Sequence, residues 1–228
     1  MFQSRRKANT FHVFIVASTL LALLFLFLGL LSIPFALIIS GVFFVSSIFF
    51  LFLFVNRETW NIGAEGEENV AEHLKLLGSD YHVVHDVVLP GMKGNIDHVI
   101  IGAKGIFVIE TKNQNGLIRC NGDSWIRQKI GRRGTRYFVN IGSPSKQVKR
   151  NAQLLNNYIQ ARFKTNTFVN GLVVFTNENA VLRIDNPTVA ILKPHEIVNF
   201  IKNFRSRNID GIELEELKED LRQYSQFH

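Results

Sequence analysis

The sequence predicts a mixed α/β domain in which one mixed β-sheet is flanked by helices, with a two-helix transmembrane hairpin before it. Two observations support this prediction. The chain of 228 residues begins with a long apolar segment, and the rest alternates between helical and extended patterns of apolar residues. Helices and strands that alternate in this order pack in layers around a common core.

The apolar segment is long enough for two membrane spans. No Asp, Glu, Lys or Arg occurs between Ala8 and Asn56, and one spanning helix needs about 20 apolar residues. Because Pro34 lies near the midpoint, we expect helices at about 11–31 and 35–55, after a basic N-terminus at 1–10. A secretory signal peptide has a shorter apolar core, of about 7–15 residues. A buried soluble hairpin would be apolar on one face rather than all round.

The flanking charges predict the orientation of these spans. Arg5, Arg6 and Lys7 precede the first span and Arg57 follows the second, so the positive-inside rule places both termini and the following domain in the cytoplasm. The expected location is therefore the cell membrane, with the lipid bilayer as a partner. Cys120 agrees with a cytoplasmic domain, because a single cysteine can form neither an intramolecular disulfide nor a cysteine-based zinc cluster.

The formal net charge of +7 includes a strongly basic block. From Lys104 to Arg150, eleven Lys and Arg residues are opposed only by Glu110 and Asp123, whereas the tail after Ser206 holds six acids and three bases. Such a block predicts a polyanionic partner, with nucleic acid as the first candidate and anionic lipid as the alternative. The residues expected to contact nucleic acid are Arg127, Lys129, Arg132, Arg133, Arg136, Lys146, Lys149 and Arg150.

A helix is expected first in the soluble part, from residues 61–66 to about Leu77, with Gly78 as its cap. Its apolar stripe consists of Val70, Ala71, Leu74 and Leu77. Glu67 lies three and four positions before this stripe begins and therefore faces inward. An inward carboxylate needs a partner or a chemical task.

The remaining elements follow in order. A strand is expected at 81–89, a hairpin at 94–112, and short basic strands at 117–119, 125–129 and 137–141 that extend the sheet. Ser143 and Pro144 fit the start of a long helix, as its cap and first residue. Further strands at 168–177 and 189–192, a helix at 194–204 and an acidic helix within 206–228 complete the chain.

The hairpin places charged side chains at the open end of two apolar strands. If the turn is centred between Ala103 and Lys104, paired residues have numbers that sum to 207, so Asp97 lies opposite Glu110. Side chains alternate along a strand, and Lys112 therefore shares their face. Strands that are apolar on both faces are normally buried, so these charges need an explanation.

Phosphodiester hydrolysis would explain them. Mg²⁺ prefers oxygen ligands, which Asp97, Glu110 and the backbone carbonyl of Thr111 could supply. Lys112 would reach the attacking water or the phosphate. Glu67 could serve as a further ligand or as a base that orients the water.

These residues resemble the signature of the PD-(D/E)xK nuclease superfamily, and more closely its nuclease-related domain, NERD. The matching segments are 63–67, 95–99, 108–112 and Pro144 with Gln147, within about 63–192. Ile96 stands where the signature often has proline. The resemblance implies a restriction-endonuclease-like fold over 57–205, with Glu67, Asp97, Glu110 and Lys112 catalytic and Gln147 auxiliary. It also implies metal-dependent cleavage of DNA.

The expected function is thus a membrane-anchored nuclease, an endonuclease or exonuclease, that uses Mg²⁺ or Mn²⁺ on DNA. The alternative is a non-catalytic module that binds nucleic acid or protein at the membrane, in which Asp97, Glu110 and Lys112 form a buried salt-bridge cluster. RNA as a substrate and a homodimer as the assembly stay open. The histidines near the strands, His73, His82, His85 and His98, match no standard metal-ligand spacing and are expected to be structural.

Overall fold

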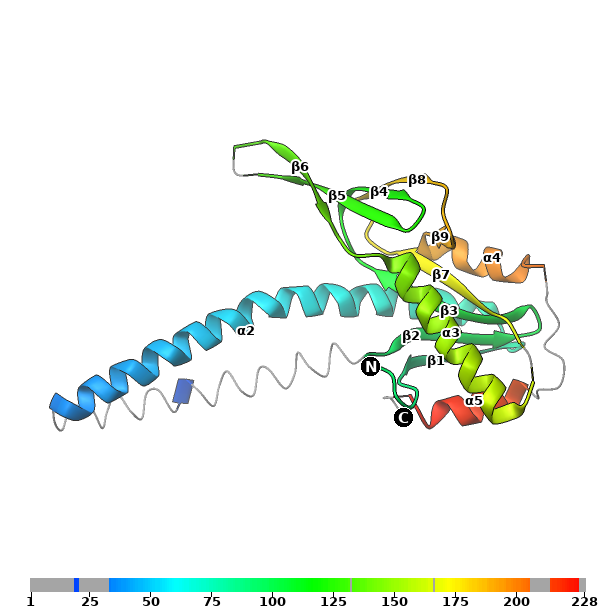
Figure 1. The fold of residues 1–228 in the computed structure, drawn as a ribbon, viewed down its shortest axis with the longest axis horizontal. Coiled ribbons are helices and arrows are strands. Elements are labelled where there is room, and N and C mark those ends of the chain that lie inside the picture. The colour runs from blue at the N-terminus through cyan, green and yellow to red at the C-terminus, as the bar shows by residue number, and fades with distance from the viewer. Residues whose placement is uncertain (1–18, 21–32, 132, 166, 206–213, 226–228) are drawn as a thin grey trace. The chain divides into compact units, whose positions relative to one another are not determined.

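The computed structural model describes residues 19–20, 33–131, 133–165, 167–205 and 214–225. The chain divides into two units, Met1–Ala64 and Glu65–His228 (Figure 1). The elements are α2 (Ile33–Leu74), η2 (Lys75–Leu77), β1 (Tyr81–Val87), β2 (Ile96–Gly102), β3 (Gly105–Lys112), β4 (Gly116–Asn121), β5 (Ser124–Ile130), β6 (Arg136–Asn140), α3 (Pro144–Phe163), β7 (Val169–Phe175), β8 (Ala180–Asp185), β9 (Ala190–Leu192), η3 (Pro194–Glu196), α4 (Ile197–Lys202) and α5 (Leu214–Arg222).

The predicted membrane spans fall in the first unit. The first span, 11–31, lies outside the described residues except for Thr19 and Leu20, and the second, 35–55, falls within α2. Several large apolar side chains of this part of α2 are exposed, namely Ile38, Val42, Phe44, Val45, Ile48, Phe49 and Phe52. Within the part of the chain that is described, no helix is both long enough and apolar enough to cross a membrane.

The second unit contains two mixed β-sheets, where the sequence predicted one. The first sheet has the strand order β1-β2-β3-β7-β9, with β1, β2 and β3 antiparallel and β7 and β9 parallel to β3. The second sheet has the order β6-β5-β4-β8, and its β8 runs parallel to β4. Both sheets are flanked by helices, so the predicted mixed α/β class is confirmed.

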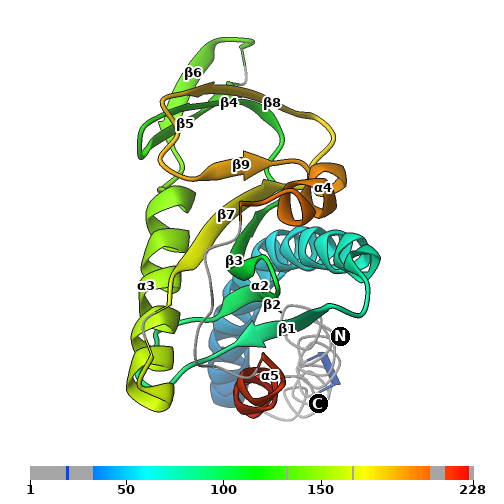
Figure 2. The same cartoon turned by 90° about the vertical axis from the view of Figure 1, so that its right-hand side faces the viewer.

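Helices cover both faces of the first sheet (Figure 2). On one face, α3 contributes Val148, Ala152, Leu155 and Ile159 to a core that also contains Leu217 and Leu221 of α5. On the other face, Val70 and Leu74 at the end of α2 pack with Ile197 and Ile201 of α4. The even-numbered residues of β3, Ile106 and Val108, face α3, whereas Phe107 and Ile109 face α2 and α4. By this alternation Glu110 and Lys112 point to the α3 side.

The register of the β2–β3 hairpin agrees with the prediction. His98 pairs with Ile109, Ile101 with Ile106, and Gly102 with Gly105, so paired numbers sum to 207. Asp97 and Glu110 follow directly after the last paired residues at the open end. The turn therefore sets which charged side chains meet, as expected for a tight hairpin.

The second sheet begins where the chain turns away from β3. Gly116 has a positive φ of 83°, a conformation that favours glycine, and its amide donates to the carbonyl of Asn179. β4 then pairs with β8, a strand that the sequence did not predict, instead of extending the first sheet. Trp125 of β5 is fully buried, stacks on Phe175 and fixes the second sheet on the first.

Helix α3 begins as predicted. Ser143 caps it by accepting the amide of Lys146, and Pro144 is its first residue. Gly171 of β7 lets the helix approach closely, because a Cβ there would lie 3.1 Å from Cγ1 of Val148. This close packing directs the first turns of α3 toward the open end of the hairpin, where Gln147 contacts Lys112.

Candidate active site

Four of the predicted residues converge at the open end of the β2–β3 hairpin. Asp97 lies in β2 directly beyond the last residue paired with β3, and its Oδ2 accepts the Thr111 amide at 2.7 Å. Lys112 Nζ donates to Glu110 Oε1 at 2.5 Å and to Gln147 Oε1 at 3.5 Å. Strands β2 and β3 and helix α3 therefore each contribute to one cluster.

The two carboxyl groups of the cluster are buried, whereas its lysine and glutamine are partly exposed. Asp97 is 9% exposed and Glu110 2%, whereas the Lys112 side chain keeps 24% of its surface. Glu110 Oε2 is buried and has no hydrogen-bond partner among the residues described. A buried carboxylate oxygen without a donor is costly, so this oxygen is suited to a cation or an incoming donor.

Burial and like charges raise the pKa values of both carboxyl groups. Burial raises the pKa of Asp97 well above its usual value, and the charges of Glu110 and Glu67 raise it further. Burial also raises the pKa of Glu110, against the opposing charge of Lys112. The lysine only partly neutralises the pair, so the cluster differs from a fully satisfied structural salt bridge.

Glu67 approaches this region from the end of α2. It follows Gly66 on α2, and a Cβ on Gly66 would lie 2.9 Å from both Asn113 Cβ and Thr176 Oγ1. The missing side chain thus lets the end of α2 lie against the ends of β3 and β7. The charge of Glu67 acts on Asp97, as the raised pKa of Asp97 indicates.

In the part of the chain that is described, no three His, Cys, Asp or Glu side chains are grouped to hold a metal ion. One Glu110 oxygen is bound to Lys112. The donor set still suits a hard cation, because it offers two acidic side chains at adjacent strand positions and a buried oxygen without a donor. The site therefore consists of a carboxylate pair with Lys112 and the side-chain amide of Gln147 beside it.

The predicted nucleic-acid residues do not all face solvent freely. Lys149 donates to Asp123 at 2.6 Å and to Thr188, and Arg127 donates to Asn115. Hydrogen bonds from Lys149, Thr188 and Ser145 hold the pKa of Asp123 below its usual range. Lys146 and Arg150 are exposed on the first turns of α3, and the charge of Arg150 acts on Glu110. Arg132 lies outside the described residues, and Lys129, Arg133 and Arg136 are exposed on the β5–β6 hairpin.

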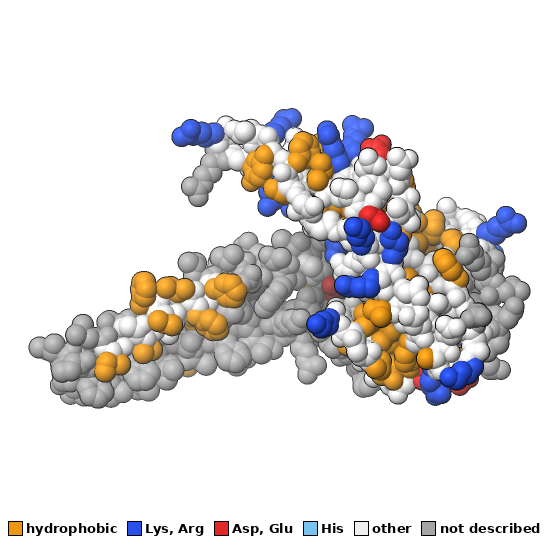
Figure 3. Space-filling view, viewed as in Figure 1, with side chains coloured by type: hydrophobic (Ala, Val, Ile, Leu, Met, Phe, Trp, Pro, Cys, Tyr) orange, Lys and Arg blue, Asp and Glu red, His pale blue; other side chains and the backbone are white. Residues whose placement is uncertain are grey.

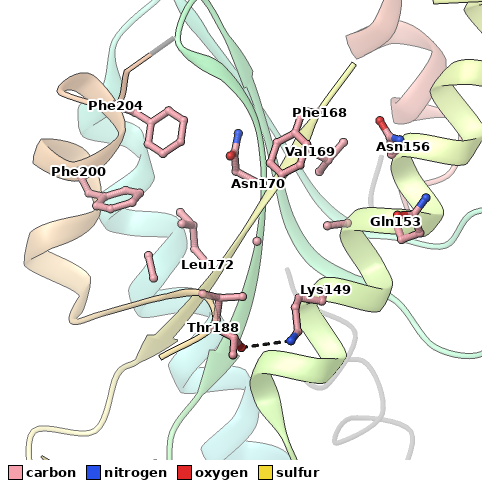
Figure 4. A pocket seen from close by; sticks show the side chains of 14 residues that line it. Lys149, Gln153, Asn156, Phe168, Val169, Asn170, Leu172, Thr188, Phe200 and Phe204 are labelled. Atoms are coloured by element: carbon pink, nitrogen blue, oxygen red, sulfur yellow. Dashed lines mark hydrogen bonds between the residues drawn. The ribbon is translucent and has the colours of Figure 1, made fainter. Parts of the chain in front are cut away.

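A separate cavity of about 450 Å³ lies between α3, β7 and α4 (Figure 4). Phe168, Phe200 and Phe204 give it an apolar wall, and Lys149 points across it toward Thr188. None of the predicted catalytic residues lines this cavity. The cavity is therefore distinct from the carboxylate cluster.

The histidines occupy structural positions. His85 Nδ1 and His98 Nδ1 lie 2.7 Å apart, and burial lowers the pKa of His98 and that of His85, the latter to about 4. Both rings are therefore neutral at neutral pH, and one nitrogen donates to the other. His82 lies 3.0 Å from Glu215 of α5, and His73 Nδ1 bonds to the carbonyl of Asn69.

One residue of interest was missed by the sequence argument. Asn151, one helical turn after Gln147, is 2% exposed, and its Oδ1 has no partner in the described part of the structure. A polar asparagine among the apolar positions of the α3 stripe was the signal in the sequence that could have identified it. Its spacing from Gln147 places both amides on one side of the helix.

The model of the nuclease-related domain, NERD, matches residues 62–176, which are 115 of the 228 residues. The chain belongs to the NERD family. The matched region includes every residue of the cluster, from Glu67 through Asp97, Glu110 and Lys112 to Gln147. A nuclease-related domain makes a nuclease the leading candidate function.

An uncharacterized protein of Bacillus anthracis, pXO1-01, is 42% identical to this chain over 60 residues. That match spans 25% of this chain and 28% of the Bacillus protein. No solved structure matches the chain. The membership of the NERD family therefore rests on the domain match.

Proposed function

We propose that this NERD protein is a nuclease that hydrolyses phosphodiester bonds of DNA with Mg²⁺ or Mn²⁺. The supporting observation is the convergence of Asp97, Glu110, Lys112 and Gln147 at one end of a buried sheet. Two buried carboxyl groups with raised pKa values beside a partly exposed lysine are typical of an active site. Exposed Lys146 and Arg150 at the start of α3 would attract a polyanionic substrate.

Asp97 and Glu110 would hold the divalent cation, with the Thr111 carbonyl and Glu67 as further predicted ligands. The partnerless Oε2 of Glu110 and the charge repulsion that raises the pKa of Asp97 both favour a cation here. When bound, the cation would supply charge neutralisation at the phosphate and a more acidic water. Asp97 is already oriented by the amide of Thr111.

Lys112 would stabilise the charge that develops on the phosphate. Glu110 and Gln147 hold its ammonium group from two sides, and the side chain is open enough to meet a substrate. Such preorganised charge lowers the barrier because it needs little rearrangement during the reaction. Gln147 would act as a positioning residue, and Glu67 would orient the attacking water.

A second candidate function is a non-catalytic module that binds nucleic acid or protein at the membrane. The observation in its favour is the 2.5 Å contact between Lys112 and Glu110, which occupies one carboxylate oxygen. A cluster closed in this way needs no metal. Binding to DNA that is indifferent to EDTA, without cleavage, is the behaviour expected of this module.

Cleavage of labelled DNA by the purified full chain, with and without Mg²⁺, tests the proposal. Asp97→Asn and Lys112→Ala should each lower the rate by about 100-fold or more, because each removes a group from the reacting centre. Lys104→Ala is the matched control, since it removes one charge from the closed end of the hairpin. Thermal unfolding verifies that each variant folds, and RNA is assayed in parallel.

Undiminished cleavage by both site variants would contradict the proposed nuclease. Absence of cleavage with Mg²⁺ and Mn²⁺, together with EDTA-indifferent DNA binding by the wild type, would establish the second candidate instead. A loss that is equal in Lys104→Ala and Lys112→Ala would point to a general charge effect rather than to a site.

We also propose that the chain acts at the cell membrane, with both termini and the second unit in the cytoplasm. The absence of Asp, Glu, Lys and Arg between Ala8 and Asn56 supports this location, as do the exposed apolar side chains on α2. The flanking basic residues support the orientation. A nuclease anchored in this way would meet nucleic acid at the inner membrane surface.

A further inference from the structure

The outer face of the second sheet is a basic and aromatic surface that faces solvent. Residues on this face alternate with the buried Ile118, Cys120 and Trp125 of the inner face. The pairing of β6, β5, β4 and β8 brings the outward residues together. We call the basic and apolar part of this face the outer platform; it consists of Leu117, Arg119, Ile126, Gln128, Ile130, Arg136, Phe138, Val181 and Arg183. Asp185 shares this face at the end of β8.

Two arginines lie side by side on the outer platform. Arg119 and Arg183 are direct partners in the parallel β4–β8 ladder, and both are exposed. Like charges at paired positions destabilise a sheet. No described acidic side chain forms an ion pair with Arg119, Arg136 or Arg183, and Figure 3 shows Lys and Arg side chains along this part of the molecule. A polyanion would relieve this repulsion.

The platform also carries apolar and aromatic surface. Phe138 is 42% exposed, and the guanidinium of Arg119 lies over its ring, 4.8 Å from the centroid. Ile130 is 69% exposed and Val181 53%. Flat aromatic and guanidinium groups stack on nucleobases, and aliphatic side chains pack on base faces. Lipid headgroups offer the charge but no flat faces to this surface.

We propose that the outer platform binds single-stranded nucleic acid. In a duplex the base faces are stacked on one another, so only an unpaired strand can use both the arginines and Phe138. This assignment differs from the predicted basic set, because Arg127 and Lys149 donate to Asn115 and Asp123. Phosphates meet Arg119, Arg136 and Arg183, while bases stack on Phe138 and the guanidinium above it.

The platform is connected to the candidate active site at both ends. The chain enters the second sheet four residues after Lys112 and returns from Asn140 to the cap of α3, four residues before Gln147. Two short connections therefore tether the sheet that carries the platform to the carboxylate cluster. The role of the platform in substrate choice rests on the proposed nuclease, and it predicts a preference for substrates with a single-stranded segment.

Fluorescence anisotropy of the full chain in EDTA tests binding separately from cleavage, with an oligonucleotide of about 20 nucleotides. Arg183→Ala should reduce the slope of log affinity against log salt by roughly 0.7, the value for one phosphate contact on a single strand. Phe138→Leu keeps apolar bulk but loses the ring, so it should weaken binding about 5- to 100-fold with an unchanged slope. Lys104→Ala, with the same charge loss elsewhere, should bind as the wild type.

Each of these results would overturn the proposed platform. The slope of log affinity against log salt could be equal in Arg183→Ala and Lys104→Ala, Phe138→Leu could bind the oligonucleotide as tightly as the wild type, or the wild type could bind duplex as tightly as single strand. Binding to phosphatidylserine vesicles that depends on Arg183, without binding to the oligonucleotide, would also overturn it. Oligonucleotide binding without cleavage in Mg²⁺ would leave the platform intact and contradict the nuclease. If Arg183→Ala and Phe138→Leu cleaved with the KM and rate of the wild type, the role of the platform in substrate choice would be contradicted and the nuclease would stand.

Discussion

At the scale of single residues, the burial of the Asp97 and Glu110 carboxyl groups opposes stability. Both carboxyl groups are buried, and burial raises the pKa of each. For Asp97 the neighbouring carboxylates add to this effect. A residue chosen for stability alone would be apolar or fully paired here.

Asp97→Asn should stabilise the metal-free protein at neutral pH. A raised pKa means that the native state binds more protons than the unfolded state, so wild-type stability falls as pH rises from the usual Asp value through the raised pKa. The variant removes this loss, while an amide oxygen can still accept the Thr111 amide. We expect a higher Tm than wild type at pH 7 in EDTA, and no difference at low pH.

Asp123→Asn is the control variant, for which the expected change in Tm at pH 7 has the opposite sign. Hydrogen bonds from Lys149, Thr188 and Ser145 lower the pKa of Asp123, so its contribution is present above the usual Asp pKa and is lost on acidification. This variant should have a lower Tm at pH 7. Mg²⁺ should then raise the Tm of the wild type and of Asp123→Asn but not of Asp97→Asn. A lower Tm for both variants at pH 7 would contradict the charge-repulsion account.

At the scale of elements, the end of α2 and the ends of β3 and β7 fit together through a glycine. Gly66 lies in a helix interior, where glycine is normally unfavourable. A side chain at this position would collide with Asn113 and Thr176. The close approach brings Glu67 near enough for its charge to act on Asp97.

Gly66→Ala should therefore reduce stability and activity together. Overpacking of this kind typically costs about 1–3 kcal/mol, and displacement of Glu67 should lower cleavage by roughly 10-fold or more. Gly63→Ala, three residues earlier in α2, is the matched control, because a Cβ there meets nothing within 4 Å. It should leave cleavage intact and leave stability equal or up to about 1 kcal/mol higher.

Chemical denaturation and a cleavage assay measure both variants. If Gly66→Ala were as stable and active as Gly63→Ala, the close approach would not be needed to position Glu67. If both variants lost stability equally, the effect would belong to α2 as a whole.

At the scale of the whole molecule, the two units differ in their residues. Glu65–His228 holds both sheets and the candidate site, and Met1–Ala64 holds the apolar segment. α5 belongs to the second unit: Leu217 and Leu221 are fully buried, and the amide of Val88 donates to the carbonyl of Tyr224. The acidic C-terminal helix thus completes the core beside α3.

The proposed membrane location predicts how the whole chain fractionates. The full chain should remain with membranes after washing with high salt and alkaline carbonate, because apolar spans are held by the hydrophobic effect rather than by charge. A variant without residues 1–56 should appear in the soluble fraction. Protease should reach the second unit only after the cell membrane is opened. Release of the full chain by salt alone would contradict membrane spans.

The sequence allowed accurate prediction where the interactions are local. The turn at Ala103 and Lys104 sets the hairpin register, so the meeting of Asp97, Glu110 and Lys112 followed from spacing alone. The start of α3 at Ser143 and Pro144 followed in the same way, because capping involves residues within one turn.

Distant contacts were the ones that sequence reasoning missed. β8 was not predicted, and β4 pairs with it across a separation of 64 residues, so no local pattern signalled the second sheet. Lys149 was expected to contact nucleic acid, but Asp123 on another element binds it. Arg119 and Arg183 become neighbours only through that same parallel pairing.

By itself, the sequence determined the α/β class, the hairpin register, the membership of the NERD family and the identity of the carboxylate cluster. The periodicity of apolar residues and the residues of a tight turn reflect interactions between near neighbours in the chain, so they can be inferred from the sequence. Only the tertiary structure decided that the basic block forms a second sheet with an arginine-rich outer face. It alone decided that the end of α2 brings Glu67 near enough for its charge to act on Asp97, since parallel pairing and helix packing join residues far apart in the chain.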